Sequence, residues 1–143
     1  MNQSLDIQSV SWQEGQSDLE AVRIVVFVKE QHVPQDIEMD DRDAFCLHVL
    51  AKDKAKPIGT GRIDIEKHGK IGRVAVLKER RGQGIGKAIM EALETMARRA
   101  HLSTVWLNAQ TCAQSFYERQ DYVPSGDTFL EADIPHCRME KTL

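Results

Sequence analysis

Long hydrophobic runs and a leader-like N-terminus are both missing from the sequence. The longest uninterrupted apolar stretch covers residues 24–28, whereas a membrane-spanning helix needs about 20 apolar residues. Residues 1–6 lack the charged-then-apolar pattern of a signal peptide, so we expect neither export nor membrane attachment. Cysteine is scarce as well, and the widely spaced cysteines form no C-x-x-C pair, which is typical of reduced thiols. These absences predict a cytoplasmic protein without a membrane partner.

Metal-ligand clusters and an excess of positive charge are missing too. His, Cys, Asp and Glu residues show no paired ligand spacing, so we expect no metal site. The chain has 19 basic and 22 acidic residues and a net charge of −3, which argues against nucleic acid as a partner. Repeats, low-complexity segments and linkers are absent, and 143 residues of ordinary composition are enough to bury one core. We therefore expect a single domain over residues 1–143.

The informative part of the chain is a short strand pattern, a basic glycine-rich turn and a long amphipathic helix in direct succession. Residues 74–77 form a short apolar run that is typical of a buried strand. From residue 85 the period changes, and apolar residues recur at the three-and-four spacing of one helix face. These residues are Ile85, Ala88, Ile89, Ala92, Leu93, Met96 and Ala100.

A turn of this kind at the start of a helix is suited to an anion. The first amides of a helix have no intrahelical acceptor, and the macrodipole places partial positive charge there. Glycines let an anion approach the backbone and allow φ > 0, while basic side chains add formal charge. The residues concerned are Arg80, Arg81, Gly82, Gly84, Gly86 and Lys87. The alternative is an exposed basic turn without a ligand, but we favour a phosphate site because glycines, charges and helix start coincide.

Two common phosphate motifs do not fit this turn. A dinucleotide fingerprint G-x-G-x-x-G that starts at Gly82 would need glycine at the position of Lys87. A P-loop G-x-x-x-x-G-K-[ST] would need glycine in place of Arg81 and a hydroxyl residue in place of Ala88. We therefore expect neither a dinucleotide-binding nor a nucleotide-hydrolysing site.

The pattern that remains is R-x-x-G-x-G over residues 81–86, after an apolar strand. It resembles the acetyl-CoA-binding motif of the GNAT family of N-acetyltransferases. The resemblance extends to L-N-A-Q at residues 107–110 and S-F-Y-E at residues 115–118, where the family has an Asn and a Phe-Tyr pair. Asp121 departs from the family pattern, which commonly has glycine before the next aromatic residue. The chain is also similar to a bacterial branch typified by the ElaA and YjcF proteins, at residues 26–31, 33–34, 129–131 and 134–136.

The predicted elements follow an order that fits the same family. A helix opened by a capping box at Ser17 and Glu20 would run to residue 27, a second would start at Ile85, and a short third near Thr111. This order predicts an α/β (α+β) fold. The resemblance implies a GNAT-like mixed, mostly antiparallel central sheet flanked by helices. We expect its strands at residues 7–12, 46–52, 58–66, 73–77, 103–108 and 137–141.

The resemblance implies acetyl-CoA (coenzyme A) as co-substrate, without a metal. Backbone amides over residues 82–87 would cradle the pyrophosphate, and residues 74–76 would pair with the pantetheine arm through their main chain. One strand amide would polarise the thioester carbonyl, a contribution of roughly 3–4 kcal/mol per donor. The cofactor-binding residues implied in this way are Val74, Ala75, Val76, Arg81, Gly82, Gln83, Gly84, Ile85, Gly86, Lys87, Asn108 and Tyr117.

Tyr117 and Asn108 are the catalytic residues that the resemblance implies. A phenol, with an ordinary pKa of about 10, is protonated at neutral pH and suits a thiol leaving group, so Tyr117 would act as general acid. The alternative is an aromatic side chain that only packs beside Phe116. Asn108 would hydrogen-bond the cofactor or an ordered water, or it would simply end its strand.

The acceptor side of the site is less clearly indicated. His136 belongs to the branch pattern and is expected to contact the substrate, although a lone histidine is more often structural. Residues 34–43 are rich in carboxylates, which form either a solvated loop or a lip that attracts a cationic amine. A water chain could replace a protein base. Candidates for substrate contact or for the general base lie on elements near the expected cleft and are Glu30, His48, Asp64 and Glu66.

These features together predict an acetyl-CoA-dependent N-acetyltransferase that moves an acetyl group to a primary amine. No histidine motif supports Cys112 as a nucleophile, so we expect direct transfer in a ternary complex. The alternative is a non-catalytic acetyl-CoA-binding sensor or interaction module, which would keep the glycine turn but need no general acid. A homodimer is the default expectation for a small enzyme.

Overall fold

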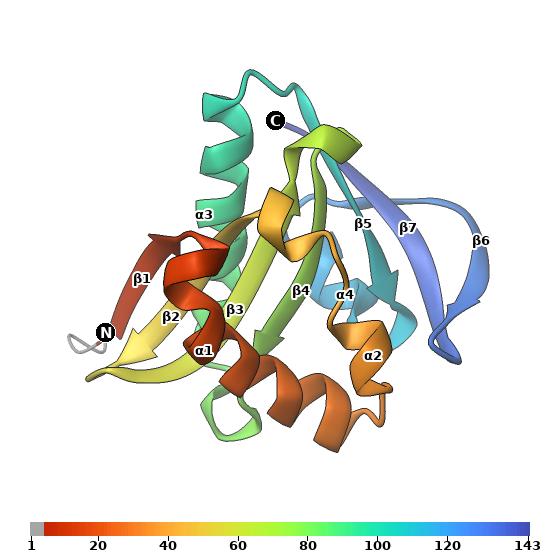
Figure 1. Cartoon of the computed structure of the whole chain (residues 1–143). Helices are drawn as coiled ribbons and strands as arrows, with labels where there is room; N and C mark the ends of the chain where they lie inside the picture. Colours follow the sequence, from red (N-terminus) through yellow and green to blue (C-terminus); the bar gives the residue numbers. More distant parts are fainter. Residues whose placement is uncertain (1–4) are drawn as a thin grey trace.

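A seven-stranded sheet in the order β1-β2-β3-β4-β5-β7-β6 forms the centre of the computed structural model, which describes residues 5–143 (Figure 1). Residues 1–4, part of the segment without a leader pattern, lie outside the described residues. All neighbouring strands are antiparallel except β4 and β5, which confirms the predicted mixed, mostly antiparallel sheet. The strands are β1 (Leu5–Val10), β2 (Leu47–Asp53), β3 (Lys56–Asp64), β4 (Lys70–Val76), β5 (Thr104–Gln110), β6 (Val123–Glu131) and β7 (Ile134–Thr142).

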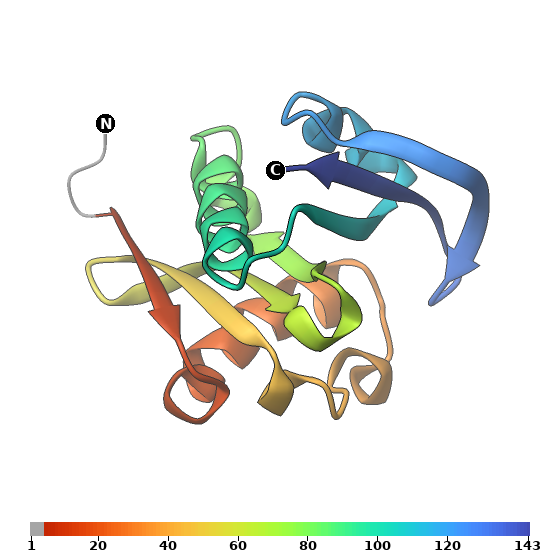
Figure 2. The same ribbon diagram turned by 90° about the horizontal axis from the view of Figure 1, so that it is seen from above.

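Helices cover both faces of the sheet. The helix α1 (Trp12–Arg23) continues as a π-helical segment η1 (Ile24–Glu30), and the long helix α3 (Ile85–Arg99) packs on the opposite face, as Figure 2 shows. Two short helices, α2 (Gln35–Glu38) and α4 (Gln114–Glu118), border the site described below. Within residues 5–143, no helix combines the length and apolar character that crossing a membrane requires.

The predicted helix from Ile85 is confirmed, and its apolar face forms much of the core. Ile89 and Leu93 are fully buried against β3. A Cβ at Gly61 would lie 2.7 Å from Ile89 Cγ2 and 2.8 Å from Leu93 Cδ1, closer than real Cβ contacts. Glycine in β3 therefore lets α3 approach the sheet closely enough to exclude water from this layer.

The first helix begins earlier than predicted. It starts at Trp12, and Ser11 is its N-cap: the Ser11 hydroxyl oxygen accepts from the Glu14 amide at 3.1 Å. The same hydroxyl donates to the Glu14 carboxylate at 2.9 Å, so Ser11 and Glu14 have the spacing of a capping box. The prediction of a helix start at Ser17 was wrong because the same signature occurs six residues earlier, directly after the strand.

The strand β6 was not predicted, and its exposure explains why. All nine of its residues are exposed, so the strand has no apolar alternation that a sequence pattern could reveal. It is held at the edge of the sheet by antiparallel pairing with β7 alone. Its two-residue connection to β7 places Glu131 directly opposite Ile134.

The strands β4 and β5 separate after a short stretch of pairing. Their parallel register covers only Lys70↔Trp106 and Ile71↔Leu107, and Figure 1 shows the two strands diverging beyond it. On its other edge β4 carries one extra residue relative to β3, a bulge at which Arg73 has φ of 52°. The second half of β4 therefore presents a main-chain edge to the space between the two strands.

Candidate active site

A cleft of about 700 Å³ runs along the second half of β4 and the turn that leads into α3. It brings together ten of the residues predicted to bind the cofactor. Gln83 instead accepts a hydrogen bond from Arg80 Nε at 3.2 Å, and Asn108 lies in a neighbouring cleft. The ten residues that line the cleft are Val74, Ala75, Val76, Arg81, Gly82, Gly84, Ile85, Gly86, Lys87 and Tyr117. We call this space the cofactor cleft.

Gly84 and Gly86 are needed in the turn for different structural reasons. Gly84 is the N-cap of α3 and has φ of 81°, a left-handed conformation that other residues adopt only with strain. Gly86 has no unusual φ, but a Cβ there would lie 3.0 Å from Phe116 Cζ. One glycine thus shapes the turn, and the other lets α4 pack against the start of α3.

The start of α3 has the properties of an anion site. Gly84 offers no side-chain cap, and the first turn contains no acidic residue, so helix amides remain available. Lys87 lines the same cleft and adds positive charge, while Arg80 and Arg81 line it as partners of Asp53 and Glu30. The free backbone, the positive charge and the space left by the missing Cβ atoms fit a pyrophosphate group.

Glu30, which was considered for the acceptor side, contacts this turn instead. Arg81 Nη1 and Nη2 donate to the Glu30 carboxylate oxygens at 2.8 and 2.9 Å, and Arg81 Nε donates to the Val76 carbonyl at 2.9 Å. The hydrogen bonds from Arg81 hold the pKa of Glu30 below its usual value. Glu30 is therefore an ionised partner of the turn over residues 81–86, which we call the cofactor turn.

A second cleft, of about 410 Å³, opens beside the first between η1, α2, β4, β5 and β7. Asn108 of β5 and His136 of β7 both line it. We call this space the acceptor cleft. Three residues line both clefts and mark where they meet: Val74, Ala113 and Tyr117.

Tyr117 lies at this junction on α4. Its ring meets Phe116 edge-to-face at 5.0 Å between centroids, and Tyr122 at 5.9 Å. Burial raises the pKa of the Tyr117 phenol above its ordinary value, because the charged phenolate is less well solvated. The phenol is thus protonated at neutral pH and adjoins both clefts, as a general acid requires.

His48 and Glu66 do not line either cleft among the described residues. His48 is buried, with Nε2 at 2.8 Å from the Asp43 carbonyl oxygen, and burial lowers its pKa. Glu66 is exposed and accepts a hydrogen bond from Arg42 at 2.9 Å. His48 lies on the expected strand, β2, whereas Glu66 lies in a 3₁₀ turn (Ile65–Lys67) after the end of β3 and not in the expected strand. The side chains of both residues are directed to other partners.

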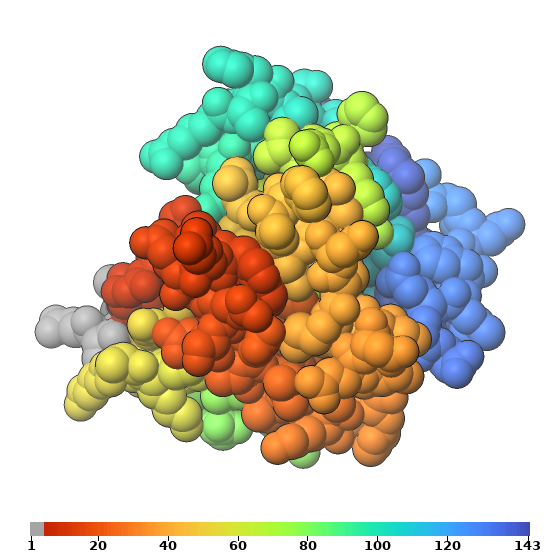
Figure 3. Space-filling view, viewed as in Figure 1, coloured from red at the N-terminus to blue at the C-terminus, as the bar shows by residue number. Residues whose placement is uncertain are grey.

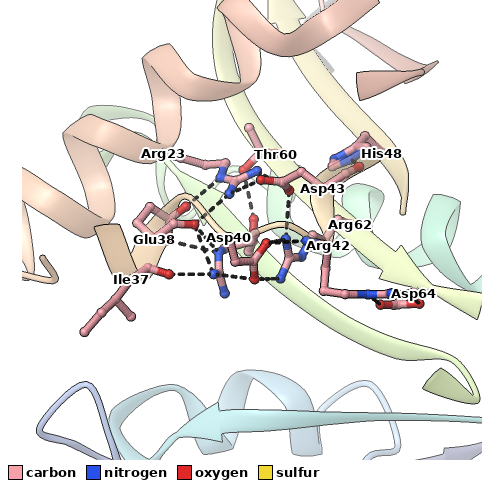
Figure 4. A network of polar contacts seen from close by, with 11 residues as sticks. Arg23, Ile37, Glu38, Asp40, Arg42, Asp43, His48, Thr60, Arg62 and Asp64 are labelled. Carbon is pink, nitrogen blue, oxygen red and sulfur yellow. Dashed lines mark hydrogen bonds and ion pairs between the residues drawn. The ribbon is translucent and has the colours of Figure 1, made fainter. Parts of the chain in front are cut away.

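The acidic residues 34–43 divide into two groups: Asp36 and Asp41 are exposed, whereas Glu38, Asp40 and Asp43 are paired with arginines. Figure 3 shows this segment, in orange, between α1 and the C-terminal strands. Two of its carboxylates, Glu38 and Asp43, are almost fully buried and are paired with Arg23 of α1 (Figure 4). Arg23 Nε lies 2.6 Å from Glu38 Oε1, and Arg23 Nη1 lies 2.9 Å from Asp43 Oδ1.

Two further arginines from the sheet complete this network. Arg62 of β3 contacts Asp43 at 2.7 Å and Asp40 at 2.8 Å, and Arg73 of β4 contacts Glu38 at 3.0 Å and Asp40 at 3.2 Å. Burial alone would raise the pKa of Asp40, but the hydrogen bonds and charge of Arg62, with Arg73, hold it well below its usual range. The network therefore supplies the acceptor cleft with a wall of neutralised charges rather than a negative field.

Sequence reasoning missed this network because its members are far apart in the chain. The same is true of Gln31 and Gln110, which connect η1 to β5 through a 2.7 Å hydrogen bond across the acceptor cleft. No local pattern distinguishes such residues from surface polar residues. Over residues 5–143, no group of three or more His, Cys, Asp and Glu side chains is arranged to hold a metal ion.

The fold and the paired clefts are those of an acyl-CoA acyltransferase, and comparison with known proteins gives the family. The acetyltransferase (GNAT) domain model matches residues 15–143, so the chain belongs to the GNAT family. This family uses acetyl-CoA as its acyl donor.

Bacterial relatives share most of the chain. It is 44% identical to the uncharacterized N-acetyltransferase YjcF of Bacillus subtilis over 122 residues, 84% of this chain and 87% of that protein. The structure of an acyl-CoA N-acyltransferase from Pseudomonas aeruginosa is similar with a TM-score of 0.86 and 32% identity, covering 97% of this chain and 100% of that one. Escherichia coli ElaA has a TM-score of 0.83 and 31% identity, covering 95% and 99%.

Proposed function

We propose that this protein transfers the acetyl group of acetyl-CoA to a primary amine by direct attack in a ternary complex. The observation that carries the proposal is the meeting of two clefts at Val74, Ala113 and Tyr117. One cleft has the chemistry of a pyrophosphate and thioester site, and the other is large enough for a small amine or an amine-bearing side chain.

The cofactor cleft would bind its ligand mainly through the main chain. The amides at the start of α3 would hold the pyrophosphate, with Arg81 and Lys87 adding charge. The open edge of β4 would pair with the pantetheine arm as an added strand does. An amide of residues 74–76 would donate to the thioester oxygen as negative charge develops there.

Acetyl-CoA supplies the activated acyl group, and the chain supplies orientation and proton transfer. Tyr117 would give its phenolic proton to the departing thiolate, since it lies where both clefts meet and burial keeps it protonated. Asn108 faces the acceptor cleft from β5, a position from which its amide would orient the amine or a water.

The cysteines support direct transfer rather than an acetyl-cysteine intermediate. Cys46 and Cys137 are buried, and Cys112 is exposed, with Sγ at 3.7 Å from Gln110 Oε1. None of the three lines either cleft. An attacking thiolate would have to adjoin the thioester, so the amine itself is the better nucleophile.

A non-catalytic acetyl-CoA sensor is the second candidate. The observation that favours it is the cofactor cleft, which would bind acetyl-CoA whether or not a reaction follows. The contiguous acceptor cleft and the protonated phenol at the junction favour the enzyme, because a sensor would need neither.

One experiment separates the two functions. The protein is incubated with acetyl-CoA and, in turn, spermidine, free lysine, an aminoglycoside and a lysine-containing peptide, and free thiol is measured with time. We expect thiol release that depends on the amine, with acetylated amine detected by mass spectrometry. Double-reciprocal plots that intersect support a ternary complex, whereas parallel lines contradict it. Acetyl-CoA binding by calorimetry without release for any amine would favour the sensor.

Three expectations from the sequence stay predictions: a single domain over residues 1–143, a cytoplasmic location, and a homodimer. Analytical ultracentrifugation would test the last of these.

A further inference from the structure

The carboxylates that line the acceptor cleft differ in their partners. Asp64 receives hydrogen bonds from Arg42 at 2.8 and 2.9 Å, and these hold its pKa below the usual value. Glu38 and Asp40 are paired with the arginines of the network described above. A carboxylate held by arginine is a weak proton acceptor, because protonation would leave the cation without its partner. These three residues are therefore poor general bases.

Glu131 and His136 also line the acceptor cleft, and His136 is the buried one of the two. His136 is 6% exposed, and its Nδ1 lies 2.6 Å from the Ile134 carbonyl oxygen. A carbonyl only accepts hydrogen bonds, so Nδ1 carries the hydrogen of the neutral imidazole. Nε2 is then the unprotonated nitrogen, which is the form that can accept a proton from an ammonium group.

The strand register relates the position of His136 along β7 to that of Val74 along β4. His136 pairs with Gln110 across β5 and β7. Leu107 of β5 pairs with Ile71 of β4. Gln110 is three residues beyond Leu107, and Val74 is three residues beyond Ile71. The bulge at Arg73 shortens the β4 path by about one residue, so Val74 lies level with Ala109 or Gln110. His136 therefore lies on the far side of β5 from β4, and it lines the acceptor cleft together with Val74.

Neighbouring groups hold the imidazole and set its charge environment. The Phe129 ring stacks on it at 6.0 Å between centroids. Glu131 of β6 places Oε2 at 3.6 Å from Nε2, and half of the Glu131 side chain is exposed. Lys70 of β4 lies close enough to Glu131 for their charges to interact. The carboxylate of Glu131 is therefore positioned to stabilise an imidazolium without blocking Nε2 by a direct hydrogen bond.

We propose that His136 is the general base that deprotonates the acceptor amine, and that Glu131 is its positioning partner. The inference rests on the proposed function. His136 Nε2 takes one proton from the ammonium group, and the free amine attacks the thioester carbon to form the C–N bond. The C–S bond then breaks, and the thiolate takes the Tyr117 proton. As the amide forms, the nitrogen loses a second proton to solvent, and solvent returns a proton to the Tyr117 phenolate. The imidazolium of His136 then releases its own proton to solvent. One proton is released per acetyl group transferred.

The test compares His136→Gln with His101→Gln, a control at an exposed position after α3. With the best amine of the panel at pH 7, we expect kcat/KM of His136→Gln to fall by about 100-fold or more. The Kd for acetyl-CoA should stay within twofold, and the control should match the wild type. The deficit should shrink as pH rises, because the amine itself then loses its proton in solution. A structural role would give a deficit that does not depend on pH.

Glu131→Gln provides an independent measurement, since this exposed side chain can be changed without opening the core. We expect about a fivefold fall in kcat with the KM for the amine unchanged, because the imidazolium that forms during proton transfer loses a stabilising charge. Wild-type rates in His136→Gln, or an unchanged kcat in Glu131→Gln, would overturn the inference while leaving the proposed function intact. No transfer by the wild type to any amine would overturn both.

Discussion

Arg81 of the cofactor turn and Glu30 at the end of η1 form a two-point ion pair, with N–O distances of 2.8 and 2.9 Å. Arg81 also donates to the Val76 carbonyl, on the strand proposed to bind the pantetheine arm. Next to Glu30 in the chain, Gln31 lines the acceptor cleft. The pair therefore holds the end of η1, next to the acceptor cleft, against the turn that lines the cofactor cleft.

Glu30→Gln should tighten binding of coenzyme A. The substitution removes a negative charge that competes with the phosphates for Arg81. We expect the Kd to fall by up to about fivefold, which corresponds to the ~1 kcal/mol upper range of partly exposed ion pairs. Calorimetry at low and high salt would measure it, and the gain should shrink at high salt because screening weakens all these charges.

Glu140→Gln is the matched control for this change. Glu140 of β7 is also a partly exposed glutamate paired with an arginine, Arg138, at 3.1 Å, but it lines neither cleft. The Glu140→Gln substitution should leave the Kd for coenzyme A unchanged. Equal tightening in both variants would mean that net charge, not the Arg81 contact, sets the affinity.

Tyr117→Phe should lower turnover by about 100-fold or more while acetyl-CoA binding is retained, because the thiolate loses its proton donor. Burial raises the pKa of Tyr117 above the ordinary value of about 10, so the acid form persists as pH rises. The wild type should therefore show no loss of kcat from this group below pH ~10. Pre-steady-state thiol release would measure the chemical step directly.

Tyr122→Phe separates catalysis from packing. Tyr122 is buried, contacts Tyr117 edge-to-face, and donates to Glu94 at 2.8 Å. Loss of a hydrogen bond to a charged group should lower the free energy of unfolding by ~1.5–3 kcal/mol with little change in turnover. Similar turnover losses in both variants would count against a proton-donor role for Tyr117.

The parts of the fold that the sequence predicted well carry local signals. The apolar period of α3 and the glycines before it lie within one continuous stretch, so helix and turn could be located from residues 81–100. The departure at Asp121 was also visible in the local sequence, and Asp121 has φ of 73° at the position where the family commonly has glycine. Aspartate tolerates this left-handed conformation better than most residues, so the departure leaves the turn intact.

The parts that escaped prediction depend on contacts between distant residues. Arg73 reaches Glu38 across 35 positions of sequence, and no spacing rule links them. The exposed strand β6 lacks an apolar period, and with it the proximity of Glu131 to His136 was invisible. The helix α3 and the glycine turn before it could therefore be located from the sequence, whereas the acceptor cleft required the structure.

Gly84→Ala should weaken coenzyme A binding through backbone strain. The residue has φ of 81°, and a non-glycine residue in this region costs ~1–2 kcal/mol. Since no atom lies within 4 Å of the added Cβ, the strain acts through the turn and not through a clash. We expect a loss of ~1 kcal/mol in stability and about a tenfold higher Kd, because the Cβ also faces the anion site.

Gly126→Ala is the control for backbone strain. Gly126 of β6 has φ of 85° and open space around its Cβ position, but it lies outside the cofactor cleft. It should lose similar stability in urea unfolding and keep its Kd for coenzyme A. If Gly84→Ala bound coenzyme A as tightly as Gly126→Ala, the turn would not be the phosphate site.

Arg23→Met should be the most destabilising of these changes. Arg23 is 1% exposed and pairs with Glu38 and Asp43, which are also buried. Removing one partner leaves buried carboxylates with incomplete compensation from Arg62 and Arg73, so we expect a loss of ~3 kcal/mol in urea unfolding at pH 7.

Arg138→Met removes an arginine whose pair with Glu140 is about half exposed, and should cost no more than ~1 kcal/mol. Adding Asp43→Asn to Arg23→Met should recover part of the lost stability, because it removes one of the two buried charges left without Arg23. Recovery would identify uncompensated charge as the cause of the loss. A further loss in the double variant would show instead that the Asp43 charge still stabilises the fold through its pair with Arg62.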